Sequence, residues 1–154
     1  MQRYLLYMAF VLILVGCKPA PVAKLIPTQI LEVIPPGKDF PDDGIMIMAG
    51  TDGNHFVSVI VDPHEVYEGS TPIIFREFTA TIGDGLSYEH RPKQLDTQAH
   101  FKVESLDRKT KTARVYISAH LVSTNPDKHI ELDIPPTTLM ITGEHFIKLI
   151  SATK

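Results

Sequence analysis

The chain has 154 residues, 44% of them hydrophobic, and its 15 basic and 18 acidic side chains give a formal charge of −3. This acidic balance argues against nucleic acid as a partner. The length suits one domain with a hydrophobic core and is short for two, so we expect a single domain. With one cysteine in the chain, no intrachain disulfide can form, and packing must stabilise the fold.

The first 17 residues have the pattern of a targeting signal. One positive charge, Arg3, precedes an uncharged run over residues 4–16. That run is as long as the apolar region of a signal peptide and shorter than the roughly 20 residues of a membrane-spanning helix. It ends in Leu14-Val15-Gly16-Cys17, which resembles the lipobox of bacterial lipoproteins. The resemblance implies removal of residues 1–16 and lipidation of Cys17; the alternative is an uncleaved signal anchor.

The same resemblance implies a location. Lipoproteins of this class carry two or three acyl chains, which is enough for stable anchoring. In similar proteins an aspartate after the cysteine often marks retention at the inner membrane, whereas Lys18 stands here. We therefore expect the protein at the outer membrane, facing the periplasm. Cleavage removes Arg3 as the only charge, so 15 basic side chains become 14 against 18 acidic ones, a balance of −4.

Residues 17–27 are rich in proline, which disfavours helices and sheet ladders, so we expect a tether between lipid and domain. From residue 28 on, strand patterns alternate with turn patterns. Residues 28–154 are therefore predicted to form one all-β domain, an antiparallel β-sandwich of immunoglobulin-like or transthyretin-like form with about eight to nine short strands, or a small barrel. The expected strands are Thr28–Ile34, Gly44–Ala49, Asn54–Val61, Pro72–Ile82, Gln98–Leu106, Thr112–Val122, His129–Ile134, Thr138–Thr142 and His145–Ser151.

The first predicted hairpin turns at Asp52-Gly53, a strong type I′ signal. This turn would place Met48 opposite Val57 and Met46 opposite Val59. Both faces of the hairpin are then apolar. Either the hairpin is central and covered on both sides, or one face waits for a partner.

The second predicted hairpin joins Gln98–Leu106 to Thr112–Val122. Alternation of apolar and polar residues puts Val103 opposite Val115 on the buried face. On the wet face, Lys102 would lie opposite Tyr116 and Glu104 opposite Arg114.

Seven histidines invite a metal hypothesis, but their spacing contains no zinc-binding motif. In the second hairpin His100 and His120 come to a diagonal distance, from which they could share an ion. Solvated surface histidines are the favoured interpretation. The Asp62-Pro63-His64-Glu65 segment is likewise interpreted as a turn with exposed charges. We therefore predict no metal site and no cofactor.

Residues 83–96 form the longest stretch after the tether without a strand pattern, and long loops are often functional. A dinucleotide-binding loop is excluded because Tyr88 stands where a third glycine would be needed. The stretch also contains Ser87, Glu89 and His90, but no nucleophile motif, so no catalytic residue is predicted. As a recognition loop it mixes an apolar side chain, an aromatic side chain and a planar cation, and the candidate binding residues are Leu86, Tyr88, His90 and Arg91.

Together these features predict a non-enzymatic lipoprotein that binds a protein of the cell envelope. It would serve as an accessory subunit of an assembly, or as an inhibitor or immunity factor. Its expected partners are the membrane, through the lipid on Cys17, and one envelope protein. The alternative is an envelope hydrolase or metal-binding protein.

Overall fold

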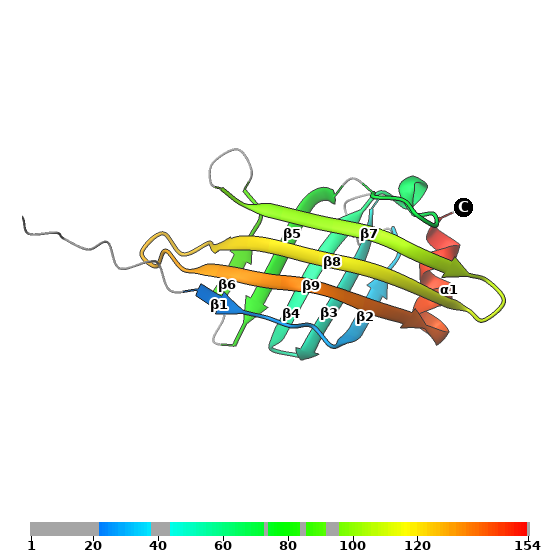
Figure 1. The fold of residues 1–154 in the computed structure, drawn as a ribbon, viewed down its shortest axis with the longest axis horizontal. Coiled ribbons are helices and arrows are strands. Elements are labelled where there is room, and N and C mark those ends of the chain that lie inside the picture. Colours follow the sequence, from blue (N-terminus) through cyan, green and yellow to red (C-terminus); the bar gives the residue numbers. More distant parts are fainter. Residues whose placement is uncertain (1–21, 38–43, 73, 84–85, 92–95, 154) are drawn as a thin grey trace, which may run out of the picture.

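The computed structural model describes residues 22–37, 44–72, 74–83, 86–91 and 96–153. Most of these residues lie in strands (Figure 1), which confirms the expected β class. The elements are β1 (Val22–Lys24), β2 (Gln29–Ile34), β3 (Ile45–Asp52), β4 (His55–Val61), a 3₁₀ turn (Pro63–Glu65), β5 (Ile74–Ile82), β6 (Leu86–Glu89), β7 (Gln98–Asp107), β8 (Thr112–Ser123), β9 (Glu131–Thr142) and α1 (Gly143–Ala152).

The strands form one curled sheet that closes about half of a barrel. Its order is β1-β9-β8-β6-β5-β4-β3-β2, and β7 also pairs with β8. All neighbours are antiparallel except β1, which runs parallel to β9. The sheet is therefore mixed, not purely antiparallel as expected. In Figure 1 the strands β7, β8, β9 and β1 cross in front of β2 to β5, and α1 lies at the end near the β7–β8 turn.

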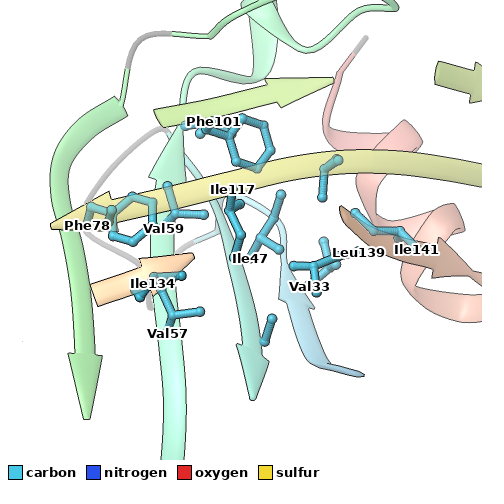
Figure 2. Packing of buried hydrophobic residues seen from close by; sticks show 14 of the residues in the cluster. Val33, Ile47, Val57, Val59, Phe78, Phe101, Ile117, Ile134, Leu139 and Ile141 are labelled. Atoms are coloured by element: carbon cyan, nitrogen blue, oxygen red, sulfur yellow. The ribbon is translucent and has the colours of Figure 1, made fainter. Parts of the chain in front are cut away.

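The core fills the space between the two crossing groups of strands. Figure 2 shows Val33, Ile47, Val57, Val59 and Phe78 from one group pointing toward Phe101, Ile117, Ile134, Leu139 and Ile141 from the other. Each of these side chains is at most 3% exposed. Burial of this many β-branched and aromatic side chains is the main stabilising term of the fold.

The predicted pairing of β7 with β8 is confirmed. Val103 lies opposite Val115, and Lys102 lies opposite Tyr116. One detail differs, because the register shifts beyond Val103 and leaves Ser105 opposite Arg114. Glu104 still reaches Arg114 across the strands, with the Nη2 and Oε2 atoms 3.6 Å apart.

The predicted register of β3 and β4 is wrong by one residue. Asp52 is not a central residue of the turn but pairs with His55, and Met48 lies opposite Ser58. The Asp52 carboxylate accepts hydrogen bonds from the backbone N–H of Asn54 and His55, at 2.8 and 2.9 Å. This capping moves the turn one residue along the chain, which alone would shift the pairing by two residues, and a bulge after Gly50 removes one of these two.

The last predicted strand, His145–Ser151, is wrong, because these residues belong to α1. Phe146 and Leu149, three residues apart on one helix face, are buried in the core at 4% and 0% exposure. Glu144 and Lys148 form an i,i+4 ion pair on the outside at 3.8 Å. Among the described residues no helix has the length and apolarity needed to cross a membrane.

Strand β9 replaces two predicted strands. It continues through Pro135 and Pro136, where the sequence predicts a break. The continuation is possible because β1 pairs with β9 only as far as Asp133. The two prolines therefore lie on a free edge, and the register to β8 shifts beside them, between Ile117 and Ala119.

The tether expected over residues 17–27 is corrected at its end. Val22–Lys24 form strand β1, paired with Glu131–Asp133. Leu25 follows with 4% exposure, and its backbone N–H donates to the Asp133 carbonyl oxygen at 3.0 Å. Residues 22–24, expected in the tether, thus belong to the sheet. Residues 1–21, with Cys17 among them, lie outside the described residues.

Candidate functional site

The predicted recognition residues lie in and beside strand β6, so the expectation of a strandless stretch is wrong. Tyr88 pairs with Ala80 on β5 and with Ser123 on β8, and its side chain is 2% exposed. Burial also raises the pKa of its phenol. Tyr88 joins the core at the corner where the two groups of strands meet, and its ring does not face solvent. Leu86, two residues earlier, is half-buried against the same core.

His90 and Arg91 directly follow β6 and are both half-buried. The backbone N–H of His90 donates to the Phe78 carbonyl oxygen at 3.0 Å, and that of Arg91 donates to the Thr97 hydroxyl at 2.7 Å. The Arg91 guanidinium is held by the carboxylate of Glu89. Partner binding by Leu86, His90 and Arg91 stays a prediction. These residues would bind from strand β6 and the two positions after it, and not from a loop.

The outer face of β7, β8 and β9 carries a shallow polar groove of about 370 Å³. It brings together His100 and His120, as the predicted register requires. The other lining residues are Gln98, Tyr116, Ser118, Ala119, Ile134 and Pro136. These side chains come from three strands, so the groove could be recognised only in part from the second hairpin.

Within this groove His120 is held by two acids of β9. Its Nδ1 lies 2.6 Å from Oδ1 of Asp133, and its Nε2 lies 3.5 Å from Oε2 of Glu131. Both ring nitrogens of His120 therefore face carboxylates. A general base would instead need a ring nitrogen within hydrogen-bond distance of a hydroxyl, such as that of Ser118 in the same groove. In the part of the chain that is described, no three His, Cys, Asp or Glu side chains gather as metal ligands.

The Met46 and Met48 side chains lie on the outer face of β3, where both are half-buried. On the same face of β4, Ser58 and Ile60 are buried at 9% and 3% exposure. The opposite face, with Ile45 and Ile47, belongs to the core. The β3–β4 hairpin is thus covered on one side by the core and largely covered on the other, which agrees better with the central interpretation.

A second hollow, which the sequence did not reveal, lies between α1 and the β7–β8 turn. It has a volume of about 260 Å³ and is lined by Phe146, Ile147, Ile150 and Ser151 of the helix and by Arg108 and Lys111 of the turn. We call it the tip hollow. The helix thus supplies the apolar side chains of this lining, and the turn supplies its two cations. In the sequence, the basic cluster Arg108-Lys109-Thr110-Lys111 is the one sign of this site. Its apolar side could not be recognised because residues 145–151 were predicted as a strand and not as a helix.

Searches against protein-family models, curated proteins and solved structures find no match to this chain.

Proposed function

We propose that this protein is a lipid-anchored component of the bacterial cell envelope whose β domain binds another envelope protein and catalyses no reaction. The observation that carries the proposal is Leu14-Val15-Gly16-Cys17 after an uncharged run, with a compact β domain following directly. Lys18 after the cysteine supports the outer membrane, with the domain in the periplasm.

The position of β1 supports an anchoring role. Val22 starts this strand five residues after Cys17, so the linker reaches at most about 17 Å. Such a linker keeps the end of the sheet that holds Val22 close to the lipid. We further propose to class the fold as an open sandwich, because two crossing groups of strands enclose one core.

The anchoring is tested by replacing Cys17 with serine in the native host. The wild-type chain is expected to incorporate radiolabelled palmitate and to fractionate with membranes, because acylation needs the thiol. Cys17→Ser is expected to lose the label and to leave the lipid-anchored fraction. A matched control, Lys18→Ser, keeps the thiol and should keep the label. Continued processing and palmitate labelling of Cys17→Ser would refute the proposal.

The binding role is tested with the acylated chain in its own membranes. Chemical crosslinking followed by mass spectrometry is expected to give one recurring partner from the envelope. That partner should be retained by the Lys24→Glu variant, a change far from the tip hollow, and lost when the β domain is unfolded. An acylated protein that crosslinks to no envelope protein would refute this half of the proposal.

A further inference from the structure

We infer that the tip hollow is a docking site for an acidic protein segment that carries an apolar side chain at its centre. The inference rests on the proposed function, because it identifies the surface through which the anchored domain would bind its partner. Three features of the described residues carry it: the chemistry of the hollow, the rigidity of the turn beside it, and its distance from the anchored end.

The chemistry of the hollow matches that occupant. Of its apolar lining residues, Phe146 is 4% exposed and Ile147 is 55% exposed. A volume of about 260 Å³ lies below the roughly 300–1,000 Å³ of small-molecule sites, so the hollow fits one or two side chains better than a cofactor. An apolar side chain of a partner would bury surface against the exposed Ile147 and its apolar neighbours in this lining.

The two cations of the hollow, Arg108 and Lys111, favour acidic residues on the partner. Neither Arg108 nor Lys111 has an ion-pair partner among the residues that the structure describes. Lys109 adds a third cation to the same turn, in a domain whose overall charge is negative. An acidic segment would be attracted to this local positive field and could pair with the guanidinium in a bidentate manner.

The turn that carries these cations is held in a fixed shape. Oδ1 of Asp107 accepts hydrogen bonds from the backbone N–H of Lys109 and Thr110, at 2.7 and 3.2 Å. A hydrogen bond from the Thr110 side chain, followed by these two backbone hydrogen bonds, lowers the pKa of the Asp107 carboxyl. Lys111 has a φ of 53°, a left-handed conformation that glycine adopts at lower cost. Lysine therefore stands here in a backbone conformation that costs it more than it would cost glycine, and its cation is positioned by the same turn.

The position of the hollow favours a protein over a lipid surface. Val22, Glu131 and Val122 lie side by side at one end of the sheet. Thr112, beside the β7–β8 turn, lies ten residues along β8 from that row, or about 33 Å. A linker of about 17 Å keeps the lipid at the Val22 end, and Figure 1 shows α1 at the opposite end. The tip hollow therefore projects away from the anchoring membrane when the domain stands on its anchored end.

The test uses the full-length protein in detergent and a fluorescein-labelled peptide, Glu-Asp-Leu-Phe-Asp-Glu, followed by fluorescence anisotropy. We expect saturable binding that weakens as salt is raised. The double variant Arg108→Glu/Lys111→Glu should weaken binding at least about tenfold, or about 1.4 kcal/mol. The control, Lys24→Glu/Lys128→Glu, makes the same charge change at the anchored end and should bind like the wild type. Equal losses in both variants would reduce the effect to net charge and overturn the inference.

Two single variants separate binding from folding. Lys111→Gly should keep or raise the melting temperature, because glycine relieves the strained φ, yet weaken peptide binding several-fold. Ile147→Ser removes an exposed apolar side chain of the hollow and should also weaken binding, whereas Ile26→Ser, which removes an isoleucine of similar exposure elsewhere, should not. Unchanged affinity in Lys111→Gly and Ile147→Ser would overturn the inference.

Vesicles of phosphatidylethanolamine with about one quarter phosphatidylglycerol provide the competing occupant. If the protein binds these vesicles less well after Arg108→Glu/Lys111→Glu, and does not bind the peptide, then the occupant of the tip hollow is a lipid surface and not a protein segment. That outcome would overturn the inference. The proposed function is judged separately. If Cys17 is acylated but the peptide does not bind, only the tip hollow loses its role; if the peptide binds but Cys17 carries no lipid, only the anchoring fails.

Discussion

His120 on β8 and Asp133 on β9 are joined side chain to side chain, with Nδ1 2.6 Å from Oδ1, in a row that continues to Lys24 on β1. The same Asp133 accepts the backbone N–H of Leu25 through its carbonyl oxygen. One residue thus links the polar groove to the strand nearest the proposed anchor. The side-chain pair is 35% and 49% exposed, so its contribution to stability is small.

The first prediction is that β1 is held by packing and not by this pair. Leu25→Ala should lower the free energy of unfolding by about 2 to 4 kcal/mol, because the side chain is 4% exposed. Asp133→Asn should cost less than about 1 kcal/mol, since it keeps the backbone bonds. Ile26→Ala, at 48% exposure, is the neutral control. Urea denaturation of the full-length protein measures all three, and a larger loss for Asp133→Asn than for Leu25→Ala would contradict the prediction.

The second prediction concerns the β7–β8 pairing. Val103→Ala removes a fully buried side chain and should lower the free energy of unfolding by about 2 kcal/mol. Lys102→Ala, the neighbouring residue on the wet face, should change it by less than about 0.5 kcal/mol. Thermal and urea unfolding compare the two variants. Similar losses for both would mean that the two faces are assigned wrongly.

The third prediction assigns Tyr88 to the core. Tyr88→Ala should cost about 3 to 5 kcal/mol, because it empties the corner between β5 and β8. Tyr88→Phe keeps the ring and should cost less than about 1.5 kcal/mol. Arg91→Ala, whose ion pair with Glu89 is partly exposed, should be nearly neutral. Circular dichroism melts give the comparison, and a stable Tyr88→Ala variant would restore the surface interpretation of this residue.

The fourth prediction is a pH effect of His90. Burial first, and then the charge of His100, lowers the pKa of His90 below its usual value of 6.5, and its Nδ1 is buried without a hydrogen-bond partner among the described residues. The unfolded chain therefore binds the proton more readily than the folded one. Stability is full above about pH 6.5 and falls as the pH drops below that value toward the lower pKa of the folded state.

This sign is checked by melting the protein at about pH 7 and about pH 5, above the range in which most carboxylates titrate. The His90→Gln variant cannot be protonated and should show a smaller drop in melting temperature than the wild type. His64→Gln removes an exposed histidine and should leave the drop unchanged. An equal drop in the wild type and in His90→Gln would contradict the prediction.

The parts of the fold that the sequence predicted are those where one face of a strand is strictly buried. In β7 and β8, alternation left one register that hides Val103 and Val115 together, and that register is the one found. In β3 and β4 both faces are apolar, so a shift by one residue cost the pattern nothing. The position of the turn then decided the register, and capping by Asp52 placed that turn differently from the Asp-Gly rule.

The helix and the tip hollow were missed for a different reason. Over residues 145–151 the apolar side chains stand at positions 146, 147, 149 and 150, which is the i, i+3, i+4 spacing of a helix and puts apolar residues on both faces of a strand; the strand prediction did not use this spacing in so short a segment. Residues 86–89 do alternate apolar and polar side chains, but the segment is only four residues long and was assigned to a stretch without strand pattern. Burial of Tyr88 depends on its pairing with Ser123 of β8, about 35 residues later, which local patterns cannot show.

Strand β1 has a consequence for the order in which the protein is made. Val22 pairs with Glu131, 109 residues later, so the first strand synthesised has no neighbour until the last one exists. For a chain exported from its N-terminus, residues 22–24 would therefore remain without this partner until Glu131 has followed them. β1 can pair with β9 only after synthesis has passed Glu131. A chain that stops before Glu131 leaves β1 without this partner.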